Sequence, residues 1–267
     1  MSDVDLTKLK LRYVPPEDYE DEEEEEDEAP PPAKRAKVRE YEIRQDDQVL
    51  GTLEFFYIDA KDPGVDFFLD LDGFSREASD VAFELFDRSG QLQKRYIRQG
   101  TRVWGRETTA TGKIFYLKEL KIKRPFQRKG VGRWALQELL NSTSDKKLKN
   151  MRFLFCWPAA LTNEFEDVMF RRELGATAAE TRQLADEQER FEKAQDGAVV
   201  FFQKAGFRRV GTTRFFCCAR DTEHPSRKIK PEDDAKLDEK EDEEDPVNDE
   251  GLTRYDMFRR SAGMPYR

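Results

Sequence analysis

The sequence predicts one mixed α/β domain, an α+β fold whose mixed sheet is flanked by helices, between two charged extensions. Apolar and polar residues roughly alternate from Tyr41 to Tyr57 around Asp46-Asp47, which is typical of a hairpin or bent strand. Apolar residues from Ala78 to Phe86 recur instead at helical spacing. The short apolar run Met151 to Trp157 follows a glycine-containing loop and an amphipathic segment, and this order predicts a βαβ unit.

Charge separates this domain from its extensions. Of the 267 residues, 39% are charged and 37% are hydrophobic, which is too much charge for a core that runs through the whole chain. Residues 17–28 hold 11 acids and residues 232–245 hold ten acids with two lysines, so the remainder carries +10 although the whole chain carries -9. We therefore expect a disordered acidic arm (1–38), a folded domain (39–222) and an acidic, mostly disordered tail (223–267).

Composition also excludes several classes of protein. The three Cys and one His have no paired spacing, which argues against a disulfide framework and against a metal site. No apolar run reaches about 18 residues, and the N-terminus lacks the apolar stretch of a secretory signal. We expect a soluble protein of a reducing compartment, with no metal and no membrane contact.

A basic cluster, Ala33-Lys34-Arg35-Ala36-Lys37-Val38-Arg39, follows three prolines. Lysine and arginine on an extended, exposed stretch suit an acidic groove of a carrier protein, and the cluster resembles a monopartite nuclear localisation signal. The alternative is an ordinary solvated linker. We expect a nuclear import carrier as a partner and the nucleus as the location, with the cytoplasm as the alternative.

The remaining elements follow in order along the chain. Ser75 is positioned to cap the helix that begins after it, and Ser89-Gly90 ends it. The β-rich runs Thr101–Thr108 and Lys113–Lys123 flank a turn at Ala110-Thr111-Gly112, so we expect them to pair antiparallel. A last helix from Asp196 to Ala205 precedes Gly206, and a final β run extends from Phe207 to Ala219.

The segment with most chemical information lies between the predicted strand 114–123 and the next helix: Gln127-Arg128-Lys129-Gly130-Val131-Gly132. Two glycines allow close approach of a ligand, and the N–H groups and dipole of a helix N-terminus suit a pyrophosphate. Four bases, Arg124, Arg128, Lys129 and Arg133, add positive charge. The alternative is a tight turn that needs small residues.

This segment resembles a known motif. Leu120-Lys121-Ile122-x-x-x-x-Gln127-x-x-Gly130-x-Gly132 is similar to the acyl-CoA binding motif Q/R-x-x-G-x-G/A of the GNAT (Gcn5-related N-acetyltransferase) superfamily. About seventy residues later, Phe201-Phe202-Gln203-Lys204-Ala205-Gly206-Phe207 resembles its closing motif. The resemblance extends over roughly residues 41–219 and implies a GNAT-like acyl-CoA N-acyltransferase fold, a mostly antiparallel sheet that splays at its middle.

The resemblance also implies roles for particular residues. Backbone N–H groups of Gln127, Arg128, Lys129, Gly130, Val131 and Gly132 would hold the CoA pyrophosphate. Leu120, Lys121 and Ile122 would pair with the pantetheine arm of acetyl-CoA. The acyl group would lie between the strand 114–123 and the strand 151–157, and Glu119 is the candidate base, acting through water; the alternative is a solvated strand carboxylate.

One position departs from the family. Phe202, which we also assign to the cofactor site, stands where many members have a Tyr that protonates the leaving thiolate, and Phe has no proton to give. Gln195 stands where an Asn is often found, and Cys156 or a residue of the insertion 161–195 is a candidate substitute donor. The nine acids of that insertion are candidates to attract a cationic acceptor, or form a charged helix face with pairs such as Glu189 to Lys193.

These observations lead to a principal hypothesis and two others. The first is an acetyl-CoA dependent N-acetyltransferase that acts on a primary amine, with a basic protein as one candidate acceptor. The second is a catalytically weak GNAT-like module that binds acyl-CoA or a partner protein. Nucleic-acid binding by the basic body is not expected, because the acidic extensions repel phosphate.

Overall fold

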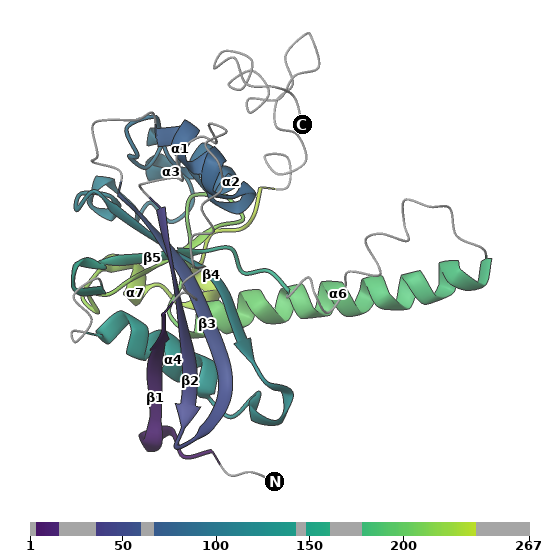
Figure 1. The fold of residues 1–267 in the computed structure, drawn as a ribbon. Coiled ribbons are helices and arrows are strands. Elements are labelled where there is room, and N and C mark those ends of the chain that lie inside the picture. The colour runs from purple at the N-terminus through teal and green to yellow at the C-terminus, as the bar shows by residue number, and fades with distance from the viewer. Residues whose placement is uncertain (1–3, 16–35, 60–66, 143–147, 161–177, 239–267) are drawn as a thin grey trace, which may run out of the picture.

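The computed structural model describes residues 4–15, 36–59, 67–142, 148–160 and 178–238 (Figure 1). A seven-stranded sheet has the order β1-β2-β3-β4-β5-β7-β6. Its strands are β1 (Leu9–Val14), β2 (Ala36–Gln45), β3 (Gln48–Asp59), β4 (Lys113–Ile122), β5 (Phe153–Cys156), β6 (Arg208–Arg209) and β7 (Phe216–Ala219). All neighbours are antiparallel except β4 and β5, which are parallel. The mixed α/β sheet predicted from the sequence is confirmed.

Two layers of helices cover the two faces of the sheet. On one face, α1 (Phe67–Phe74), α2 (Arg76–Leu85) and α3 (Lys94–Arg98) share a core with Phe56, Tyr116 and Phe155. On the other face, α4 (Val131–Asn141) and α6 (Ala178–Lys204) share a core with Leu53, Phe115 and Leu154. The final helix, α7 (Pro225–Lys228), is a single short turn after β7.

Several predicted elements are confirmed. The hairpin β2–β3 turns at Asp46 and Asp47, and Asp46 adopts the positive φ of 51° that such a turn requires. Ser75 caps α2, since its hydroxyl accepts the Ala78 N–H at 3.1 Å. The chain from β4 through α4 to β5 forms the parallel βαβ unit.

The predicted arm 1–38 is wrong in two places. A 3-10 helix, Leu6–Lys8, leads into β1, which pairs antiparallel with β2. The strand β2 begins at Ala36, whose side chain is buried, so the second half of the basic cluster belongs to the sheet rather than to an extended linker. The apolar residues Leu9, Leu11 and Tyr13 alternate with basic residues over too short a stretch to predict a strand. The strand β1 forms because it pairs with β2.

The run Thr101–Thr108 does not form the predicted partner of β4, which pairs with β3 instead. It is irregular and ends in the 3-10 helix Arg106–Thr108, because Thr108 Oγ1 donates to the Gly105 carbonyl at 2.8 Å and competes with a strand. The predicted strand Phe207–Ala219 is a hairpin of β6 and β7, with Gly211 at φ 60° between them.

The predicted tail begins too early. The 3-10 helix Pro231–Asp233 follows α7, and Asp234 then accepts the Arg209 N–H at 3.1 Å and a Gln203 side-chain N–H at 3.2 Å. The Arg208 guanidinium donates to the Ile229 carbonyl. Residues 223–238 therefore pack on the domain, held by the bases of β6.

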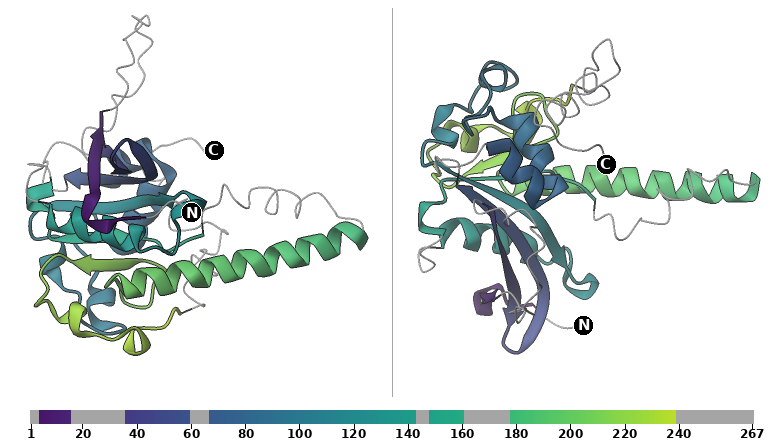
Figure 2. Two further views of the ribbon diagram at one scale, coloured as in Figure 1. Left: turned by 90° about the horizontal axis from the view of Figure 1, so that it is seen from below. Right: turned by 45° about the horizontal axis from the view of Figure 1, so that its top comes forward.

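The helix predicted from Asp196 to Ala205 is α6, which is longer than predicted and extends beyond the body of the domain. Figure 2 shows α6 projecting away from the sheet in both views. Glu189 and Lys193 form the expected i,i+4 pair at 2.5 Å. Within the insertion 161–195, residues 161–177 lie outside the described part, and residues 178–194 belong to this projecting helix instead of lining a groove. No helix in the described ranges has both the length and the apolar character to cross a membrane.

Candidate functional site

The parallel ladder between β4 and β5 is short. It joins Phe115 to Leu154, Tyr116 to Phe155 and Leu117 to Cys156 and then stops, while β4 continues to Ile122 along β3. Between the paired positions Leu117 and Glu119, Lys118 is an extra residue opposite the Glu54–Phe55 step of β3, which is a β-bulge. β5 ends at Cys156, where the ladder ends, so in the described part of the chain the β4 edge from Lys118 to Ile122 has no strand partner on the β5 side.

This free edge leads directly into the loop before α4. The Gln127 side chain closes the loop, because its Nε2 donates to the Ile122 carbonyl at 2.8 Å. The Gln127 N–H donates to the Arg124 carbonyl at 3.3 Å, so this group of the predicted pyrophosphate site already has an acceptor. Gln127 thus shapes the loop as well as lying in it.

Two residues of the loop have left-handed backbone conformations. Gly130, the N-cap of α4, has φ 84°, which glycine adopts without strain. Arg128 has φ 60°, a conformation that costs a non-glycine residue about 1–2 kcal/mol. A strained residue that is kept in an exposed loop is typical of functional backbone.

Glycine is required at position 132 for packing. A Cβ at this position would lie 3.1 Å from the tip of the Phe201 ring and 3.6 Å from Ile122. The absent side chain lets α6 pack against the first turn of α4 at the end of β4. At Gly130, by contrast, a Cβ would make only an ordinary contact, 3.4 Å from Leu6, so φ is what selects glycine there.

The first turn of α4 presents backbone donors. The Trp134 N–H makes the first bond of the helix, to the Gly130 carbonyl at 2.9 Å, so the N–H groups of Val131, Gly132 and Arg133 precede the helical ladder. The surrounding bases, Arg124, Arg128, Lys129 and Arg133, are all exposed. Donors, helix dipole and cations together favour an anion at this end of the β4 edge.

Gln195 of α6 holds the segment that follows β5. Its amide Nε2 donates to the Pro158 carbonyl at 2.7 Å, and its Oε1 accepts the Ala160 N–H at 2.9 Å. One side chain of α6 therefore holds residues 158–160, which follow the end of β5. The direction of this segment is set by α6, which the sequence alone does not reveal.

Phe202 lies in the hydrophobic core, and its assignment to the cofactor site stays a prediction. Its side chain is 8% exposed and packs edge-on against Phe201 and Phe207, both at 5.2 Å between ring centres. Cys156, the last residue of β5, is buried, and burial raises the pKa of its thiol well above the ordinary value. That thiol therefore stays protonated at neutral pH.

Glu119 lies on β4 just beyond the bulge, directly opposite Glu54 of β3. The two carboxylates would repel each other, but Lys118 Nζ binds Glu54 Oε1 at 2.7 Å. Glu119 is partly exposed, so the structure brings the predicted base to the start of the free edge. Glu119, Leu120, Lys121 and Ile122 thus follow one another along that edge.

A second group of polar residues, not predicted from the sequence, lies where α2 packs near the end of the β4–β5 ladder. Burial raises the pKa of Glu77, in the first turn of α2, and the nearby Tyr116 hydroxyl partly opposes this shift. Burial likewise raises the pKa of Asp80, one turn later. Arg214, before β7, binds Glu84 at 3.1 Å and stacks over Trp157 at 4.6 Å. Glu77 was missed because an acid after a helix N-cap is common for purely local reasons.

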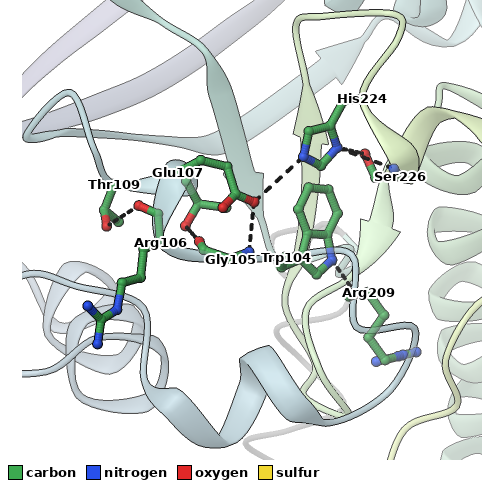
Figure 3. Close-up of polar contacts among 9 residues, drawn as sticks. Trp104, Gly105, Arg106, Glu107, Thr109, Arg209, His224 and Ser226 are labelled. Carbon is green, nitrogen blue, oxygen red and sulfur yellow. Dashed lines mark hydrogen bonds and ion pairs between the residues drawn. The ribbon is translucent and has the colours of Figure 1, made fainter.

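His224, the only histidine, joins Ser226 and Glu107 in an arrangement that resembles a nucleophilic triad (Figure 3). Its Nδ1 lies 2.9 Å from Ser226 Oγ and accepts the Ser226 N–H at 3.2 Å, while Nε2 lies 3.7 Å from Glu107. Ser226 is fully buried, and the ring stacks on Trp104 at 5.5 Å between centres. The cluster therefore serves as the cap of α7 and attaches the C-terminal segment to the domain.

The described residues contain no group of three or more Asp, Glu, His or Cys that could hold a metal ion. Comparison of the chain with protein-family models, with curated proteins and with solved structures gives no match.

Proposed function

We propose that the protein is an acetyl-CoA dependent N-acetyltransferase that acts on a primary amine. The observation that carries this proposal is the β4 edge that extends beyond the end of β5 and leads into the first turn of α4, whose free N–H groups suit an anion. An extended pantetheine arm could add to this edge as a strand would, with its pyrophosphate at the helix N-terminus. The motif resemblance and the geometry support the same site independently.

Bound acetyl-CoA would supply an activated acyl thioester. In our proposal, the N–H groups of Val131, Gly132 and Arg133 hold the phosphates, with Arg128 and Lys129 adding charge. Leu120, Lys121 and Ile122 provide the backbone edge for the arm. The transfer also needs a carboxylate that removes a proton from the acceptor ammonium, since only the neutral amine can attack, and Glu119 of β4 and Glu77 of α2 are the two candidates.

The leaving thiolate has no tyrosine at position 202 to protonate it. An ordinary thiol has a pKa of about 8.5, so CoA can leave without help at neutral pH. We therefore expect activity at a reduced rate. The protonated Cys156 thiol lies at the point where the ladder ends, and it is the nearest candidate donor on the β5 side.

The second candidate function is a catalytically weak module that binds acyl-CoA or a partner. Two observations favour it: Phe202 is part of the core, and the Gln195 amide is occupied by the backbone of residues 158 and 160. Both remove groups that would otherwise assist chemistry, while leaving the phosphate site intact.

A calorimetric titration of acetyl-CoA tests the cofactor site. The variant Arg128→Glu, Arg133→Glu reverses two exposed charges beside the first turn of α4, and we expect it to weaken binding at least about tenfold. The matched control, Lys94→Glu with Arg98→Glu, makes the same charge change on α3, at the far end of the body. No binding by the folded wild-type protein would overturn both candidate functions.

We also propose nuclear import through the basic cluster, although its residues from Ala36 onward are in β2. Recognition would then depend on Lys34 and Arg35 and on the exposed Lys37. The variant Lys34→Ala, Arg35→Ala, expressed as a fluorescent fusion, should lose nuclear accumulation. An unchanged distribution would contradict import by this cluster.

A further inference from the structure

Two carboxylates of α2 lie beside the end of the β4–β5 ladder without a salt bridge. Glu77 and Asp80 are one turn apart, which places their Cβ atoms about 5–6 Å from each other on one side of the helix. Within the described ranges neither forms an ion pair within 4.0 Å, although both are partly buried. Carboxylates in such surroundings are normally paired.

Two of the cations nearby are paired with other acids. Lys118 of the bulge binds Glu54 at 2.7 Å, and Arg214 binds Glu84 at 3.1 Å. The groups that act on Glu77 are Tyr116, Lys118, Glu54 and Asp80, and those that act on Asp80 are Arg214 and Arg76. Counting Arg76, the four acids and three bases of this group leave one negative charge in excess, which a cation can neutralise.

The Tyr116 hydroxyl gives a second, independent indication. Tyr116 is completely buried, and its ring is held by Phe56, at 4.9 Å between centres, and by Phe215 at 6.3 Å. Its hydroxyl lies near Glu77 but has no hydrogen-bond partner among the described residues. A buried polar group without a partner destabilises the fold, and phenylalanine would avoid the cost. A ligand on this side would explain the tyrosine.

The position of this group relative to the ladder gives it a role. Tyr116 pairs with Phe155 one residue before the ladder ends, and Lys118 is the bulge residue that follows the end of the ladder. The Tyr116 side chain belongs to the core under α1 and α2, whereas α4 and the proposed phosphate site belong to the opposite face of the sheet. Acetyl-CoA and the acceptor amine could then approach the end of the β4–β5 ladder from opposite faces of the sheet.

We propose that Glu77 and Asp80 bind the acceptor as a primary ammonium, and that Glu77 is the base of the transfer. This inference rests on the proposed acetyltransferase function. The Glu77 carboxylate takes one proton from the ammonium, the nitrogen lone pair forms the new bond to the acetyl carbon, and the carbon–sulfur bond breaks. The electron pair of that bond leaves on the CoA sulfur as a thiolate, and the second proton that the nitrogen loses as the amide forms passes through water to this thiolate. Tyr116 is a positioning residue that donates to the ionised Glu77.

The rate of CoA release from acetyl-CoA tests the proposal across pH 5.5 to 9. The acceptor probes are Nα-acetyl-lysine amide, the tripeptide amide Ser-Ala-Ala-NH2 and cadaverine, which distinguish a lysine side chain, a protein N-terminus and a small amine. For the fastest probe, Glu77→Gln should lower kcat/KM about 100-fold or more and remove the acidic limb of the pH profile. Asp80→Asn should raise KM with a smaller effect on kcat.

Tyr116→Phe should move the acidic limb to higher pH, because the lost hydroxyl had favoured the ionised carboxylate; a purely structural tyrosine would leave the limb in place. Glu138→Gln, on the exposed side of α4, is the matched control and should behave as wild type. Acetyl-CoA affinity, measured by calorimetry, should be the same in all these variants.

Three results would decide against the inference. A Glu77→Gln enzyme with the wild-type rate, while Glu119→Gln is inactive, would return the base to β4. A wild-type protein that binds acetyl-CoA but acetylates none of the three probes would overturn the acceptor site and favour the binding module. A folded wild-type protein that does not bind acetyl-CoA would overturn the proposed function itself.

Discussion

Gly132 and Phe201 meet where α4, α6 and the end of β4 converge, with 3.1 Å between the ring and the position of a Cβ at residue 132. The glycine of the candidate phosphate site is therefore also a packing glycine. A substitution at residue 132 is therefore expected to weaken the packing of α4 against α6, whether or not a ligand binds at this site.

We predict that Gly132→Val lowers the free energy of unfolding by about 1–3 kcal/mol, since extra atoms against a packed ring force a shift. Chemical denaturation measures this loss. Gly132→Val with Phe201→Leu, which shortens the opposing ring, should recover part of it. If Gly132→Val is as stable as wild type, the contact between α4 and α6 is looser than the structure shows.

We predict that Arg128→Gly raises stability by up to about 1 kcal/mol. Glycine accepts φ 60° without strain, although its greater freedom in the unfolded chain offsets part of the gain. Acetyl-CoA affinity should fall in the same variant, because a cation beside the phosphates is lost. Arg124→Gly, whose backbone lies in a 3-10 helix, is the control and should not gain stability.

We predict that Gln195→Leu disconnects α6 from the segment after β5. The Pro158 carbonyl and the Ala160 N–H each lose a hydrogen bond, at a cost of about 1–3 kcal/mol in total. Amide hydrogen exchange at Ala160 should become faster. Gln188→Leu, on the projecting part of the same helix, should leave the Ala160 exchange rate unchanged.

We predict that Glu77→Gln stabilises the protein at neutral pH relative to acidic pH. Burial raises the pKa of Glu77 above the unfolded value of 4.5, so the folded state binds this proton more tightly. The ionised carboxylate therefore opposes folding, and this penalty grows as the pH rises from about 4.5 through the folded pKa and stays constant above it. The glutamine variant does not carry this penalty.

Urea unfolding at pH 4.5 and pH 7.5 checks this sign. The free energy of unfolding of Glu77→Gln, relative to that of the wild type, should be higher at pH 7.5 than at pH 4.5. A shift in the opposite direction would mean that Glu77 is stabilised in its ionised form by a cation in the folded protein.

Local pattern was sufficient for the elements whose signals lie within a few residues. The alternation in β2–β3, the Ser75 cap of α2 and the glycine before α4 were each readable, because period and capping depend on neighbours in the chain. The order strand, loop, helix, strand then predicted the parallel pair β4–β5. The phosphate side of the candidate site follows from the same short segment.

Tertiary structure decided what depends on residues far apart. The partner of β4 is β3 rather than residues 101–108, and β1 is a strand because β2 is available to pair with it. Glu77 and Tyr116 are 39 positions apart, and Gln195 and Pro158 are 37 apart, so no local periodicity connects them. Their proximity arises from burial of two separate cores on the two faces of one sheet, and burial is a property of the folded chain.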